Sequence, residues 1–236
     1  QTFTIEVVKA EASVFLGSLV QTYDGTARSL TATTMPGGLT VTFTYDGGDT
    51  APVDAGSYAV TGTVDDTCYR GSASGTLVVN KADQIAAINF TPVSPQTYRT
   101  TNALEATGGS GTGMLTFAVV DGPGVLEDGT NLVVTSGTGT VLVRATRNED
   151  RNWKAASVTG SVTAAKADQT ISFPAVDDQK TTNKVGLAAS ASSGLPVSFD
   201  VSSGLAQIAG GTNLSFTGAG EVSIVASQAG DTNWNS

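Results

Sequence analysis

The chain has 236 residues and a formal net charge of −9, from 12 Lys and Arg residues against 21 Asp and Glu residues. This excess of negative charge argues against nucleic acid as a partner, since phosphates are neutralised by clustered basic side chains, and against anionic membrane surfaces. The chain has no histidine and one cysteine, Cys68, which excludes Ser–His and Cys–His catalytic pairs and an internal disulfide.

The first expected element is a strand-like segment, residues 2–8, which is followed by Lys9 and Ala10. The same ending, a strand and then Lys-Ala, recurs at residues 76–82 and 161–167, so the Lys residues lie 72 and 85 residues apart. Each spacing is about the length of one small β-sandwich. We therefore expect residues 1–10 to be the last strand of a preceding or neighbouring module, which Phe3, Ile5 and Val7 would complement.

Residues 11–81, module one, show the pattern of a β-sandwich. Leu39–Tyr45 alternates apolar residues with Thr, which indicates a strand with one buried face. Asp-Gly pairs at residues 24–25 and 46–47 supply positive φ at low cost and predict turns.

Residues 82–166, module two, and residues 167–236, module three, resemble each other in sequence. Gly129–Leu132 parallels Gly211–Leu214, and Phe117 parallels Phe199. Runs of helix formers at helical spacing are missing, whereas β-branched residues and Gly-rich turns are frequent. The predicted fold is all-β, with three tandem immunoglobulin-like β-sandwich domains in an elongated rod.

Module three is expected to lack its last strand. Two residues follow Trp234 in the sequence, whereas 12 residues separate Tyr69 from Lys81 and 13 separate Trp153 from Lys166. Residues 1–10 would restore this spacing if one copy followed another. The missing strand would then come either from continuous chain or from a separate copy by strand donation, and either arrangement is head-to-tail.

Module one resembles the MBG family of bacterial immunoglobulin-like repeats. The resemblance rests on segments 21–27, 38–41, 45–47, 55–58 and 71–77. Modules two and three resemble related bacterial immunoglobulin-like (Big) repeats through Lys166–Ile171 and Ser193–Val197. The resemblance implies a long protein of the bacterial cell surface, an adhesin, stalk or filament with many such modules, and it brings no catalytic residues.

The pattern Asp-x-Asn-aromatic closes modules two and three, and Cys68 replaces Asn in the first copy. In the structural interpretation, the Asp side chain accepts backbone N–H groups in a turn and the aromatic ring plugs one end of the core. In the alternative, Asp66, Asp150 and Asp231 bind Ca²⁺ at the module junctions. One or two carboxylates per site are few for an ion that takes six to eight oxygens, so the turn is favoured and no other cofactor is expected.

The function that these features favour is a structural or spacer segment of an extracellular bacterial protein. Its expected partner is itself, through head-to-tail repeats or neighbouring copies, with neither nucleic acid binding nor membrane insertion. The alternative is an adhesive module whose loops bind a surface glycan or a partner protein. Both Trp residues lie at equivalent places in the repeats, which favours the spacer, and no residue constellation supports an enzyme.

Overall fold

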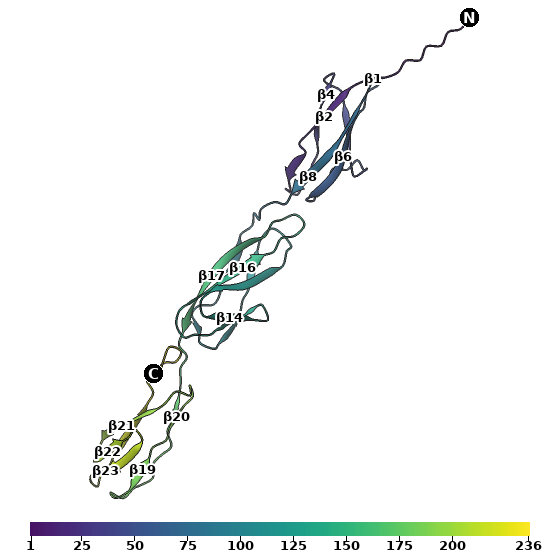
Figure 1. Ribbon diagram of the computed structural model, residues 1–236. Helices are drawn as coiled ribbons and strands as arrows, with labels where there is room; N and C mark the ends of the chain where they lie inside the picture. Colours follow the sequence, from purple (N-terminus) through teal and green to yellow (C-terminus); the bar gives the residue numbers. More distant parts are fainter. The chain divides into compact units, whose positions relative to one another are not determined.

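The computed structural model describes residues 1–236 (Figure 1). It contains 24 β-strands and no helix, so the predicted all-β class is confirmed. No helical segment that could cross a lipid bilayer is present.

The chain divides into two compact units. The first comprises Gln1–Asn89, Thr107–Thr116 and Thr146–Val158, and the second comprises Phe90–Ala106, Phe117–Ala145 and Thr159–Ser236. The division runs through module two, whose long strands pass from one unit to the other. The predicted count of three domains is therefore not confirmed, and the predicted boundaries stay a prediction.

Module one forms two main sheets, one of order β2-β4 and one of order β3-β8-β6-β5, and a short pair β1-β7. Its buried core contains Leu30, Tyr45, Val60, Leu77 and Val79. The strands are β1 (Ala10–Glu11), β2 (Ser13–Gly17), β3 (Val20–Thr22), β4 (Thr31–Met35), β5 (Val41–Tyr45), β6 (Gly56–Val64), β7 (Tyr69–Arg70) and β8 (Ser72–Asn80). The alternation predicted for Leu39–Tyr45 is confirmed, since Thr42 and Thr44 of β5 are exposed while Tyr45 is buried.

Module two has a four-stranded sheet of order β10-β17-β16-β13, a three-stranded sheet of order β11-β15-β14 and a pair β12-β9. The last strand, β17, lies between β16 on one edge and β10 on the other, and it runs parallel to β10. The strands are β9 (Ile88–Phe90), β10 (Gln96–Thr97), β11 (Thr101–Ala103), β12 (Ala106–Gly108), β13 (Leu115–Asp121), β14 (Gly124–Glu127), β15 (Asn131–Val134), β16 (Thr140–Arg147) and β17 (Ala156–Ala165).

Module three repeats part of this arrangement, with sheets of order β19-β23-β22, β21-β24 and β18-β20. Leu187, Phe199 and Leu214 form its buried core. The strands are β18 (Ile171–Ser172), β19 (Lys184–Gly186), β20 (Ser190–Ala191), β21 (Ser198–Ser203), β22 (Ala206–Ala209), β23 (Asn213–Phe216) and β24 (Ser223–Ser227). No strand of module three corresponds to β10 or β17, so its second sheet has two strands where module two has four.

The predicted Asp46-Gly47 turn has positive φ at both residues, whereas at residues 24–25 only Gly25 has it, with φ of 86°. Asp46 and Gly47, between β5 and β6, have φ of 48° and 88°, and Asp128 and Gly129 have φ of 51° and 71°. Gly enters this left-handed region without steric cost, and Asn and Asp tolerate it better than most other residues. These turns reverse the chain tightly enough to place successive strands side by side.

Candidate functional site

The free edge of β24 is the main open feature of module three. In module two the corresponding strand, β16, is paired on both edges, by β17 and by β13, whereas β24 is paired only by β21. Val141, Val143 and Ala145 of β16 are fully buried. Their counterparts Val222, Ile224 and Ala226 are only partly buried. The apolar face of β24 therefore lies beside an empty strand position.

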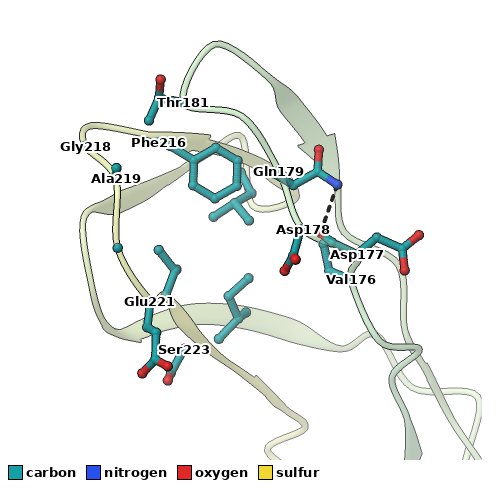
Figure 2. Close-up of a pocket in the computed structure, with 14 residues that line it drawn as sticks. Val176, Asp177, Asp178, Gln179, Thr181, Phe216, Gly218, Ala219, Glu221 and Ser223 are labelled. Atoms are coloured by element: carbon teal, nitrogen blue, oxygen red, sulfur yellow. Dashed lines mark hydrogen bonds between the residues drawn. The ribbon is translucent and has the colours of Figure 1, made fainter.

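A groove of about 630 Å³ occupies this position (Figure 2). One wall is the segment from Val176 to Thr181, and the other is formed by residues 218–224. The Phe216 ring lies between the walls (Figure 2). Its counterpart in module two, Val134, is fully buried. The groove thus exposes core side chains that a neighbouring strand covers in module two.

Gln179, in the wall of the groove, also differs from its counterpart in module two. Gln96, its counterpart on β10, is 2% exposed, and its Nε2 donates to the carbonyl oxygens of Thr100 at 2.7 Å and Leu132 at 2.8 Å. Gln179 is exposed, and its Nε2 donates to the carbonyl of Asp177 at 3.0 Å (Figure 2). Residues 176–181 form no strand, because no β17 equivalent pairs with them.

The predicted complementing residues, Phe3, Ile5 and Val7, are among the most exposed apolar side chains of the chain. They are 82%, 84% and 88% exposed, and residues 1–9 belong to no strand. The first pairing is that of Ala10, which opens β1 and lies parallel to Tyr69 of β7. The side chain of Lys9 donates to the carbonyl of Asp66 at 2.7 Å. The segment that precedes module one therefore presents an uncovered apolar surface.

A second candidate site is the joint between modules one and two, which lies within the first compact unit. The side chain of Asn152 reaches module one, where its Oδ1 accepts the N–H of Ala55 and its Nδ2 donates to Asp54 Oδ1, both at 2.8 Å. The Trp153 ring packs edge-on against Tyr23, with ring centroids 5.5 Å apart. An amide and an aromatic ring from one turn thus hold the end of the preceding module.

The joint between modules two and three, within the second unit, repeats this geometry. Asn233 Oδ1 accepts the N–H of Gly137 at 2.9 Å. Trp234 packs edge-on against Tyr98, with centroids 5.7 Å apart. Sequence reasoning placed these Asn and Trp residues in turns but missed their contacts with the preceding module. The sequence carries a signal for these contacts, because Tyr23 and Tyr98 each end a repeated Gln-Thr-Tyr motif.

The three candidate Ca²⁺ ligands occupy equivalent turns. Each of Asp66, Asp150 and Asp231 accepts with Oδ1 the backbone N–H groups of the residues two and three positions later, at 2.7–2.9 Å. No group of three or more acidic, Cys or His side chains that could hold a metal ion lies together. The assignment of Ca²⁺ to these residues stays a prediction.

Asp150 makes one further contact, because its Oδ2 accepts the N–H of Thr112 at 2.6 Å. This bond, followed by those from Asn152 and Trp153 N–H, lowers the pKa of Asp150 from 3.8 to about 2, against the opposing effect of partial burial. Hydrogen bonds donated to a carboxylate favour its charged form. The closing turn of module two is thus built around an ionised carboxylate.

Comparisons with known proteins cover the chain unevenly. Residues 12–83 match the family model described as MBG domain, which confirms the resemblance over module one. A comparison with curated proteins finds no match.

Solved structures of tandem domains are also similar to this chain. A chimeric titin Z1Z2-Z1Z2 tandem is 18% identical over 64% of this chain and 96% of its own, with a TM-score of 0.23. Mouse protocadherin-24 EC1-3 is 14% identical over 98% of this chain and 93% of its own, with a TM-score of 0.30. The three N-terminal domains of the bacteriophage RB49 highly immunogenic outer capsid protein are 20% identical to this chain. The match covers 89% of this chain and 80% of that protein's chain, with a TM-score of 0.27. With TM-scores below 0.5, no property of these proteins is transferred to this chain.

Proposed function

We propose that this chain is a non-enzymatic structural segment of an extracellular bacterial surface protein, in which β-modules are fixed end to end and the array continues head to tail. The observation that carries the proposal is the joint that occurs twice. Asn152 with Trp153, and Asn233 with Trp234, contact the preceding module in the same way. A contact repeated with the period of the modules favours a fixed orientation at each junction, which a spacer requires and a flexible linker lacks.

Two further observations support this role. Both Trp side chains pack in joints, so neither is free in a loop to form the aromatic surface that a glycan- or protein-binding module would use. The MBG match over module one supports the extracellular bacterial setting, because that resemblance implies surface-exposed repeat proteins. The net charge of −9 keeps such modules soluble and apart from other anionic surfaces.

Spin-label distance measurements test the proposal directly. In a Cys68→Ser background, Cys residues at exposed Thr33 and Ser157 would carry the two labels, one in module one and one in the part of module two that belongs to the first compact unit. We expect a single narrow distance distribution, which Asn152→Ala combined with Trp153→Ala broadens. The matched control, Asn89→Ala at an exposed position on β9, should leave it narrow. A broad distribution in the parent chain would mean that the modules are freely jointed, and the structural role would be wrong.

A further inference from the structure

We infer that the groove beside β24 binds residues 1–8 of a second copy of this chain, which add as a strand between β24 and residues 177–181. The inference rests on the proposed structural role and names the partner of the open site. A free sheet edge binds an extended segment through main-chain hydrogen bonds, while pockets for alternate side chains select its sequence.

The position of the Lys-Ala pair fixes the alignment of the segment with β8 and β17. Counting back from Lys9, Lys81 and Lys166, Val7 corresponds to Val79 and Ala164, and Ile5 corresponds to Leu77 and Val162. All four counterparts are buried in their own modules. Ile5 and Val7 are apolar at these inward positions, and Thr4 and Glu6 are polar between them. The segment thus has the side-chain pattern of a last strand, although it has no partner here.

The register against β24 follows from module two. There the N–H of Ala164 donates to the carbonyl of Gly139 at 2.9 Å, at the start of the antiparallel pairing of β17 with β16. Val222 stands 12 residues before Trp234, as Val141 stands 12 residues before Trp153. Transferring this register places Val7 opposite Gly220, Ile5 opposite Val222 and Phe3 opposite Ile224.

The other edge of the incoming strand would meet residues 177–181. In module two, Gln96 pairs in parallel with Ala164, and Ser94 Oγ accepts the N–H of Thr163 at 2.9 Å. Gln179 lies six residues after Phe173, as Gln96 lies six after Phe90. Gln179 would therefore pair with Val7, and the carboxylate of Asp177 would accept the N–H of Glu6. Segment 177–181 would become the counterpart of β10.

Phe3 is the one residue whose size departs from its counterparts, Gly75 and Gly160. A Cβ at Gly160 would meet Pro92 Cδ at 2.6 Å and Phe90 Cε1 at 2.9 Å, so module two has no room for a side chain there. Module three has Ala175 in place of Pro92, which removes one of these two obstacles. The Phe3 ring would then cover Ile224, which lines the groove.

The first test compares two pairs of substitutions on opposite faces of the segment. Because residues 1–8 make no strand contact within their own chain, substitutions there should leave every module folded, and thermal unfolding verifies this. We expect the parent chain to associate head to tail with rising concentration in sedimentation velocity. Ile5→Asn with Val7→Asn should weaken association by about 100-fold or more, because two buried aliphatic side chains are lost. The outward pair Thr2→Asn with Thr4→Asn should change it less than about threefold.

Cross-linking tests the register. In a Cys68→Ser background, Thr4→Cys lies opposite Ser223→Cys in the proposed pairing, at a separation that a disulfide spans. Oxidation should give a ladder of covalent multimers on a non-reducing gel. The matched control, Thr4→Cys with Ser227→Cys, four residues away along β24, should give none.

Three results would overturn the inference: a parent chain that stays monomeric, Asn pairs with equal effects, and equal cross-linking at the two Ser positions. The spin-label experiment on the joint is independent of association, so failure of strand addition and failure of the structural role are distinguishable.

Discussion

Asn152 and Asn233 occupy the same place in two successive closing turns, and each accepts a backbone N–H from the module before it, from Ala55 and Gly137. Asn152 makes a second hydrogen bond, to Asp54, so its side-chain amide has one more partner in the preceding module than that of Asn233. Cys68 occupies this place in module one and has no side-chain amide to offer.

Asn152→Ala is expected to lower the free energy of unfolding of the coupled modules by about 1–2 kcal/mol, because two hydrogen bonds are lost and Ala55 N–H loses its partner. Asn233→Ala removes one such bond and should cost about 0.5–1.5 kcal/mol. Urea denaturation followed by circular dichroism measures both. An equal effect of Asn89→Ala, at an exposed position on β9, would contradict the assignment.

The Tyr23–Trp153 pair should show a coupling energy of about 0.5–1.5 kcal/mol in a double-mutant cycle to Leu, as edge-to-face aromatic pairs do. Each Trp can be followed alone in a Trp153→Phe or Trp234→Phe variant, because the chain has only two Trp residues. Fluorescence of the remaining Trp then reports on its own joint. Additive effects of the single substitutions would show that the rings do not stabilise the joint together.

Acid should weaken the turn that closes module two. The pKa of Asp150 is lowered to about 2 in the folded chain, so its contribution is fully present above its ordinary pKa, near 4, and is lost as the pH falls through about 2. The contribution is about 1–2 kcal/mol after allowance for solvent screening, because the residue is partly exposed. Melting temperatures between pH 5 and pH 2 should fall less steeply for Asp150→Asn than for the parent chain. The exposed Asp49→Asn should keep the parent slope.

The two equivalent glutamines should respond differently to substitution. Gln96→Ala removes a buried side chain that donates to two carbonyls, and it should cost about 2–3 kcal/mol. Gln179→Ala should cost less than about 0.5 kcal/mol in the monomer, since that side chain is exposed. Chemical denaturation at low protein concentration compares them. A large loss of stability in Gln179→Ala would mean that the groove beside β24 is already covered in the monomer.

Glu6 provides a charge test of the proposed strand addition. The register that places Ile5 opposite Val222 places Glu6 opposite Glu221, and like charges facing each other across a strand pair are unfavourable. Glu6→Gln should therefore strengthen association by about 0.2–1 kcal/mol, a few-fold at most. Sedimentation at low salt measures the change. Weaker association of Glu6→Gln than of the parent chain would contradict the register.

Local sequence determined much of this structure, because strands and turns depend on alternation and on backbone freedom. The Thr–apolar alternation of residues 41–45 became β5, and the Asp46-Gly47 turn adopted positive φ. The repeats also predict a strand that contains Phe3, Ile5 and Val7, and this stays a prediction, because these side chains are exposed and belong to no strand.

Tertiary structure decided what these elements contact. Nothing in the local pattern states that Asn152 bonds Asp54, since 98 residues separate them and the contact exists only after both modules have folded. The same holds for the groove: residues 176–181 have no strand pattern of their own, and their role follows from lying across from β24. A side chain's chemistry belongs to its sequence, but its partner is set by the free energy of packing distant segments together, which no short stretch of residues contains.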